Sequence, residues 1–154
     1  MSTNFSGFVG EVQHRIDAAD QADAVRTTRA VLTTLGERVV EGGATDIAGP
    51  LPMEIDRYLL AAEHGHTYDY DAFIQRVTDR LNYADLDLET GYGRPSRIEP
   101  GEAVYRTKAV VALLTETVPG GKMAHVENQL PEAFDELFEF ADAETKPWEA
   151  DPNQ

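Results

Sequence analysis

The 154-residue chain contains no cysteine. This absence excludes disulfide bonds, thiolate metal ligands and cysteine nucleophiles. Apolar residues never form a run close to the ~20 that a membrane-spanning helix needs. The first residues, MSTNFSGFVGEV, lack the basic stretch followed by an apolar one that marks a secretory signal. We therefore expect a cytoplasmic protein with no membrane partner.

Serine is scarce, and none of Ser2, Ser6 and Ser96 lies in a G-x-S-x-G nucleophile turn. The segment PGGKMA at 119–124 shares only its Gly-Lys with a phosphate-binding loop. Carboxylates are so abundant that neighbouring pairs do not indicate acid–base catalysis. We predict no catalytic residue and no cofactor, and we favour a protein that is not an enzyme.

Basic residues are also few, with 13 Lys and Arg against 28 Asp and Glu, which gives a formal net charge of −15. Such a field repels phosphate groups, so we expect no nucleic-acid partner. Only Lys108, Lys122 and Lys146 are lysines. An acidic, lysine-poor surface is typical of proteins from a halophilic cytosol. Molar salt shortens the Debye length to ~3 Å and so screens the mutual repulsion of the acidic side chains. An ordinary acidic protein is the alternative interpretation.

The chain repeats its apolar pattern, since residues 23–59 match residues 102–138 without a gap after a shift of 79. The first stripe, Val25, Thr28, Leu32, Leu35 and Val39, aligns with Val104, Thr107, Val111, Leu114 and Val118. Further on, Ile47, Leu51, Pro52 and Ile55 align with Val126, Leu130, Pro131 and Phe134. Spacings of three and four place each stripe on one face of a helix.

A second match joins the preceding segments through a shift of 65. It aligns Phe5, Phe8, Val9, Val12 and Ile16 with Tyr70, Phe73, Ile74, Val77 and Leu81. The two shifts differ by 14 residues, so the second copy carries an insert, at 82–100. We predict one all-α domain, 1–142, of about eight helices in two pseudo-symmetric four-helix repeats, 4–62 and 69–141, which share one core. Residues 61–69 form the joint, and 143–154 form an acidic tail.

Residues that start and stop helices fit this plan. Asp20 is a candidate N-cap, and Pro100 is tolerated in a first helical turn. We expect Gly42-Gly43 and Gly120-Gly121 to end the second helix of each copy. Because proline pushes the preceding residue out of helical geometry, we expect Leu51 and Leu130 to turn inward at corners.

The segments RTTRAVLTTLGERV and YRTKAVVALLTETV each precede Gly-Gly, a short helix and Leu-Pro with an acidic amphipathic helix. In these features, from about Phe5 to Phe140, the chain resembles the domain-of-unknown-function 2267 family (DUF2267), as an acidic halophile-type member. The resemblance implies the helical fold. It implies no activity and no site residue.

The insert is where the copies differ, and inserted loops often carry function. Asp85, Asp87 and Glu89 alternate like a calcium loop, but the glycine comes one place late and Ser96 stands where a glutamate is needed. Arg94 and Arg97 are candidates for holding an anionic ligand or a partner's carboxylate. Their alternative role is to neutralise acidic neighbours.

Three aromatic or imidazole side chains complete the candidate contacts. His64 and His66 offer two metal ligands where zinc or nickel needs three or four, so a polar joint is the alternative and we predict no metal site. Trp148, the single tryptophan, either anchors the tail to a groove or a second subunit, or lies in a frayed terminus.

Two functions remain open. The first is a non-enzymatic helical module that binds another protein or itself, or serves a structural role. The second is a small-ligand or metal-binding protein, with an enzyme as one form of it, that uses the cleft between the repeats and has the insert as a lid. Convergent polar groups on inward faces would favour the second, and the readable stripes are almost wholly apolar, with Thr28 and Thr107 as exceptions that can bond a helix carbonyl.

The charge pattern predicts a response to salt. Because molar KCl screens the mutual repulsion of the acidic side chains, we expect the melting temperature to rise between low salt and 2 M KCl. Thermal unfolding followed by circular dichroism measures this rise. A protein that is fully folded without added salt, and gains nothing in 2 M KCl, would contradict the halophilic interpretation.

Overall fold

The computed structural model describes residues 4–83, 98–119 and 121–149. Within these ranges the chain is all-helical and forms no strand, so the predicted fold class is confirmed. Eight α-helices occur in the described part: α1 (Phe5–Ile16), α2 (Gln21–Arg38), α3 (Glu41–Ala48), α4 (Met53–Leu60), α5 (Tyr70–Tyr83), α6 (Pro100–Thr117), α7 (Lys122–Gln129) and α8 (Glu139–Asp142). Two 3₁₀ helices, η1 (Glu132–Phe138) and η2 (Pro147–Glu149), accompany them.

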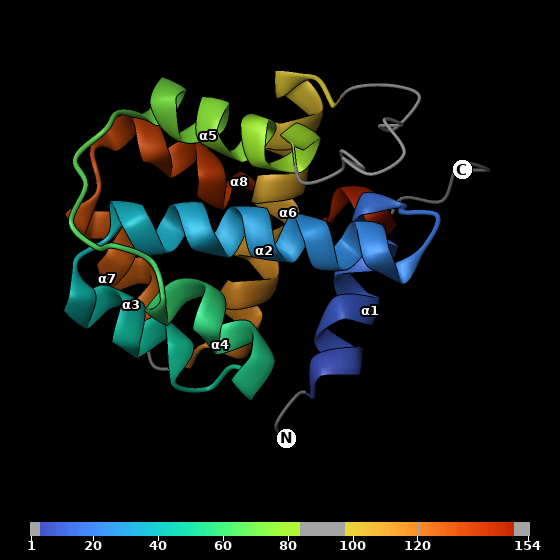
Figure 1. The fold of residues 1–154 in the computed structure, drawn as a ribbon, viewed down its shortest axis with the longest axis horizontal. Coiled ribbons are helices and arrows are strands. Elements are labelled where there is room, and N and C mark those ends of the chain that lie inside the picture. Colours follow the sequence, from blue (N-terminus) through green and yellow to red (C-terminus); the bar gives the residue numbers. More distant parts are fainter. Residues whose placement is uncertain (1–3, 84–97, 120, 150–154) are drawn as a thin grey trace.

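The two long helices, α2 and α6, are the elements on which the others pack. In Figure 1, α2 crosses the middle of the molecule, with α5 on one side and α3 and α4 on the other, while α6 runs behind it. Helix α2 contacts α1, α4, α5 and α6, and α6 contacts α1, α5, η1 and α8. None of the helices in the described part is both long and apolar enough to cross a membrane.

The apolar stripes read from the sequence meet in one core. Leu32, Leu35, Val111 and Leu114 are buried on the two long helices, and the stripes of α1 and α5 join them in the same cluster. Phe134 of η1 packs edge-on against Phe73, with ring centroids 5.6 Å apart. This aromatic contact fixes the 3₁₀ segment on α5, at the place where the sequence predicted an ordinary helix.

Local polar groups behave largely as the sequence indicated. The hydroxyls of Thr28 and Thr107 donate to the carbonyls of Ala24 and Ala103, four residues earlier, at 2.8 and 2.7 Å. A carboxylate oxygen of Asp20 accepts the amide of Asp23 at 2.9 Å, which confirms the predicted N-cap.

The helix ends and corners follow the prolines. Pro100 is the first residue of α6, as its place in the sequence suggested. The predicted corners are also confirmed, because Leu51 and Leu130 are only 6% and 9% exposed. Each therefore adds its side chain to the core just before a proline.

The glycine pairs do not end helices, so that prediction is wrong. Helix α2 ends at Arg38 because Val39 is extended, with φ −87° and ψ 163°, and α6 ends at Thr117 because Val118 is extended. Valine favours extended backbone, and Pro119 disfavours a helical Val118. Gly42 and Gly43 instead lie inside α3, and Gly121 precedes α7 with φ 74°, whereas Gly120 lies outside the described residues.

One glycine does set a helix spacing, because Gly36 of α2 lies directly against α4. A Cβ at this position would come 2.7 Å from the carbonyl oxygen of Leu59 and 3.0 Å from the Cβ of Ala62. We expect Gly36→Ala to lower the free energy of unfolding by about 1–3 kcal/mol, because α4 must move away. Urea denaturation at constant m-value measures the change.

Gly42→Ala is the matched control, because a Cβ there meets nothing within 4 Å and alanine favours the helix by ~1 kcal/mol. Equal stability of the two variants would show that Gly36 does not set the spacing between α2 and α4.

Candidate functional site

The sequence candidates of the insert cannot be placed. Arg94 and Arg97, like the acidic run Asp85, Asp87 and Glu89, lie at 84–97, outside the described residues. An anion or calcium site there stays a prediction.

The His64 side chain attaches the joint 61–69 to α2, whereas the ring contacts of His66 stay within the joint. A hydrogen bond of 2.8 Å joins His64 Nδ1 to the carbonyl oxygen of Gly36. The ring of His66 stacks on Tyr68, and its Nε2 lies 3.7 Å from Glu63 Oε1. In the ranges that the structure describes, no three His, Asp or Glu side chains gather as metal ligands do.

Beneath the joint, Glu37 of α2 forms the centre of a polar cluster. Arg80 of α5 holds it with two hydrogen bonds, Nη1 to Oε1 at 3.0 Å and Nη2 to Oε2 at 2.7 Å. The Tyr68 hydroxyl donates to the Thr34 carbonyl at 2.9 Å, and the guanidinium of Arg76 lies 4.4 Å from the Tyr68 ring centroid. The cluster joins α2, α5 and the loop between α4 and α5.

This environment shifts the pKa values of Glu37 and Tyr68. Burial by itself would raise the pKa of Glu37, but the hydrogen bonds and charge of Arg80 hold it below the ordinary value of 4.5. Burial and the charge of Glu37 raise the pKa of the Tyr68 hydroxyl. Glu37 is therefore a stably ionised carboxylate, and Tyr68 a neutral donor, which is the chemistry of a structural pair.

A matching pair joins α1 to the C-terminal end of α6. Arg15 of α1 is 5% exposed, and its Nη2 donates to Glu116 Oε1 of α6 at 2.9 Å. The shift of 65 carries Arg15 onto Arg80, and the shift of 79 carries Glu37 onto Glu116. The first helix of each sequence copy therefore pairs with the second helix of the other copy.

The long helices are also joined directly. Arg106 of α6 is 5% exposed and donates to both carboxylate oxygens of Asp23, at 3.1 and 3.2 Å, and to Thr27 Oγ1 at 2.8 Å. Sequence reasoning missed all three arginines, because it treated charge as surface. The available signal was that the alignment places arginine on arginine at 15 and 80, and glutamate on glutamate at 37 and 116.

The tail is held through Trp148, which is half-buried. Its indole lies over the guanidinium of Arg15, with the ring centroid 4.4 Å from Cζ, and packs at 71° against Phe140. The sequence left open whether Trp148 anchors the tail or lies in a frayed terminus. In the structure, Trp148 contacts Phe140 of α8, and its 3₁₀ helix η2 contacts α1.

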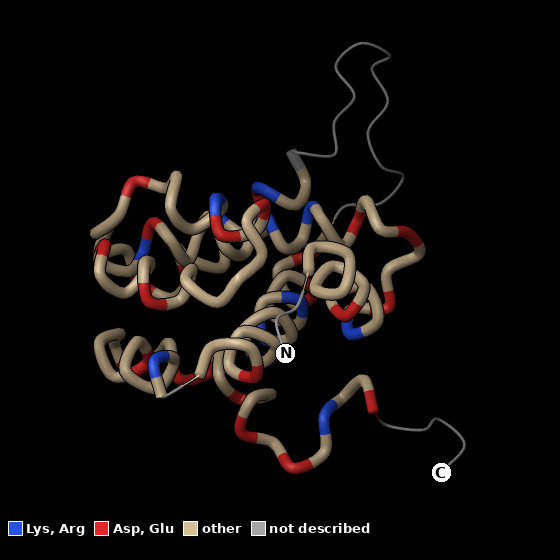
Figure 2. The backbone as a smooth tube through the Cα atoms, turned by 90° about the horizontal axis from the view of Figure 1, so that it is seen from below, with Lys and Arg blue, Asp and Glu red and all other residues tan. Residues whose placement is uncertain are grey.

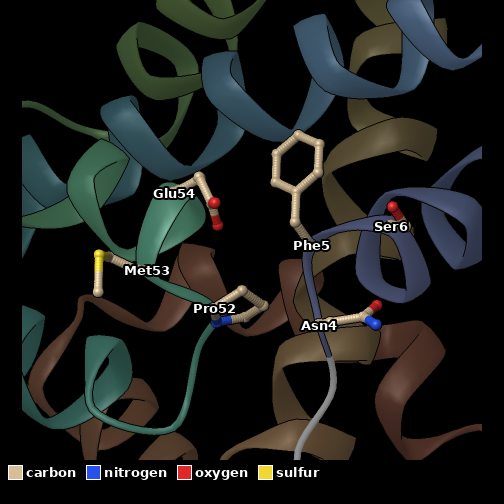
Figure 3. Close-up of a pocket in the computed structure, with 6 residues that line it drawn as sticks. All are labelled: Asn4, Phe5, Ser6, Pro52, Met53 and Glu54. Carbon is tan, nitrogen blue, oxygen red and sulfur yellow. The ribbon is translucent and has the colours of Figure 1, made fainter.

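Two hollows open on the described surface. One, of about 120 Å³, lies between the end of α2 and α7, where Val40 and Leu130 meet. The other, of about 360 Å³, lies between the first residues of α1 and α4; Figure 3 shows Pro52 and Met53 on one wall and Asn4 and Phe5 on the other. The side-chain oxygen of Asn4 is already hydrogen-bonded, because it accepts the amide of Gly7 at 2.7 Å.

Large apolar side chains are exposed in one part of the described chain, residues 40–60. Val40 is 57%, Met53 70% and Leu60 46% exposed. The shift of 79 aligns Met53 with Glu132 and Leu60 with Glu139, and both glutamates are exposed. Acidic positions are spread over the backbone in Figure 2, and residues 41–60 themselves contain four acidic residues against one basic residue.

Comparison with known proteins gives one family. Residues 5–137 match the family model described as "Uncharacterized conserved protein (DUF2267)". No curated protein matches the chain.

The Glu37 cluster predicts a pH-dependent stability. Because the pKa of Glu37 is lower in the folded chain, its contribution is complete above the unfolded pKa and is lost as pH falls through the folded one. We expect Glu37→Gln to lower the free energy of unfolding by about 1–3 kcal/mol at pH 7. The deficit should shrink as pH falls below 4.5, the ordinary value for this carboxyl.

Urea denaturation at pH 7 and at pH 4 measures this deficit. Glu116→Gln is the control, because that side chain is 51% exposed and should cost less than about 1 kcal/mol. Equal losses for the two variants, or a deficit at Glu37 that does not change with pH, would contradict the assignment.

Proposed function

The chain belongs to the DUF2267 family of uncharacterized conserved proteins, and from that premise we propose that it is a non-enzymatic helical module that binds another protein. Exposed Met53 and Leu60 on α4 carry the proposal. The aligned positions 132 and 139 hold glutamates, so a helix in this place does not need apolar side chains to fold. Solvent exposure of Met53 and Leu60 costs solubility, and a partner that covers them offsets that cost.

The proposed module consists of two four-helix repeats, 4–62 and 69–141, around a pseudo-twofold axis, with the insert 82–100 in the second. Equal lengths of 18 residues for α2 and α6, and of eight for α3 and α7, support this symmetry. The reciprocal pairs Arg15–Glu116 and Arg80–Glu37 support it as well.

The chemistry of the surface narrows the partner. Residues 41–60 contain Glu41, Asp46, Glu54 and Asp56 against a single Arg57. A partner with apolar side chains flanked by basic ones complements this surface, and steering by opposite charge speeds its encounter. The same charge disfavours nucleic acid and anionic membranes as partners, and a halophilic cytosol is the proposed location.

The alternative function, a ligand or metal binder that uses the cleft between the repeats with the insert as lid, has less support. Small-molecule sites enclose about 300–1,000 Å³ with a few convergent polar groups. The hollow between α2 and α7 is about 120 Å³, and its lining is mainly apolar, with Val39, Val40 and Val126. The larger hollow faces outward and has its asparagine already bonded.

The double substitution M53E/L60E tests the proposal. We expect it to reduce the recovery of a specific partner at least tenfold, because it places carboxylates where apolar contacts form. Affinity capture from the native cytosol in high KCl, with quantitative mass spectrometry, measures the recovery. Folding is checked by circular dichroism, and the aligned glutamates of the other copy indicate that it is retained.

The control Q21E/A22E adds the same two charges at exposed positions of α2 and should capture the wild-type set. Identical captured sets for both variants would refute a role for α4. A stoichiometric metal or small molecule, found by native mass spectrometry with metal analysis, would instead support the alternative.

A further inference from the structure

Arg15 is the most buried cation on α1, and one of its donors is unsatisfied. Its Nε donates to Glu11 at 2.7 Å and its Nη2 to Glu116 at 2.9 Å. Among the described residues, its buried Nη1 finds no hydrogen-bond acceptor. At the aligned Arg80, by contrast, both Nη atoms are bonded. A buried donor without an acceptor is costly, so Arg15 is less well satisfied than Arg80.

Aromatic rings extend from Arg15 across α6 and α8. The Tyr105 hydroxyl donates to the Arg15 carbonyl at 3.0 Å, and the Tyr105 ring meets Phe140 edge-on at 5.3 Å. Phe140 in turn meets Trp148 at 6.0 Å. We call Arg15, Tyr105 and Phe140 the Arg15 slot, and Trp148 fills it through a cation–π contact on the guanidinium.

The segment that brings Trp148 to the slot is held at two points, two residues apart. Lys146 Nζ donates to the carbonyls of Phe140, Ala141 and Ala143, at 2.8, 3.0 and 2.6 Å, where the end of α8 leaves acceptors free. The neighbours Glu144, Thr145, Pro147 and Glu149 are exposed. Figure 2 shows this segment as an arm outside the bundle, and it follows the residues 5–137 that match the family.

We propose that the Arg15 slot is a docking site for a peptide segment of the pattern lysine–x–aromatic, which the chain's own Lys146-Pro147-Trp148 fills as a removable strap. The strap displays the chemistry that fits: a cation on the carbonyls of α8 and an aromatic ring on Arg15. Tethering gives the strap an effective concentration of order millimolar, so it sets a threshold that a partner segment must exceed.

The slot lies on α1, α6 and α8, away from Met53 and Leu60 on α4. The inference therefore does not depend on the proposed function, and each can fail without the other. Peptide binding that survives M53E/L60E would show this separation directly.

The full-length double variant Lys146→Ala/Trp148→Ala, with the synthetic peptide AETKPWE, which copies residues 143–149, is the first test. The variant contains no tryptophan, so the peptide is the only strong fluorophore. We expect its emission to shift to the blue on saturable binding, with at least tenfold weaker binding to wild type, where the strap competes. The peptide AETAPWE, which lacks the lysine, should bind at least fivefold more weakly. No shift at millimolar peptide, or equal binding to wild type, would overturn the proposal.

The wild-type chain gives a second test, and its peptide titration needs no variant. Trp148 is its single tryptophan, so its emission reports the strap. Titration with AETKPFE should shift this emission to the red and increase acrylamide quenching as the strap leaves. Arg15→Lys should increase quenching without peptide, whereas the matched Arg80→Lys should not. Unchanged Trp148 emission at millimolar peptide, or equal effects of the two lysine variants, would refute the slot.

Discussion

The burial of α6 is the constraint on which the other contacts depend. Every residue from Arg106 to Leu114 is buried, so the middle of this helix is enclosed on all sides and the other elements must cover it. Two cations are buried with it. Arg106 is paired with Asp23, and Lys108 lies 3.5 Å from Glu139 and 5.5 Å from the Phe140 ring. Because a buried charge is costly unless it is paired, each cation needs a carboxylate, which α2 and α8 supply.

The same requirement explains how an acidic chain uses its few cations. Arg15, Arg80 and Arg106 each connect helices that are distant in sequence, through carboxylates on α2 or α6. Arginine suits this role because its planar fork bonds a carboxylate at two points. With these arginines engaged inside, acidic side chains dominate the surface. The two proposed binding surfaces are the exposed apolar residues of α4 and the slot that is occupied by the chain's own tail.

The sequence predicted what depends on periodicity and missed what depends on pairing across the fold. Helical spacing identified the stripes of α1, α2, α5 and α6, and proline identified the corners at Leu51 and Leu130. The glycine pairs gave a wrong prediction of the helix ends, because Val39 and Val118 before them have extended backbone and already end α2 and α6. The 3₁₀ form of η1 was not predicted, nor was the packing of its Phe134 on Phe73, which no local pattern encodes. Likewise, the acceptors of Arg15 lie on two helices, one of them 101 residues further along the chain.

Salt acts differently on the contacts at the two proposed binding surfaces. In molar KCl the Debye length is about 3 Å, so long-range steering between a −15 chain and a basic partner is lost, whereas contacts at van der Waals distance are not screened in this way. Apolar contacts at Met53 and Leu60 should strengthen with a salting-out ion, because such ions favour burial. Both contacts of the strap are short-range. Trp148 lies on the partly desolvated guanidinium of Arg15, and Lys146 donates to neutral carbonyls and needs no opposite charge. Strap and partner segment would compete through identical contacts, so salt should change their relative occupancy little even while it changes the rate of exchange.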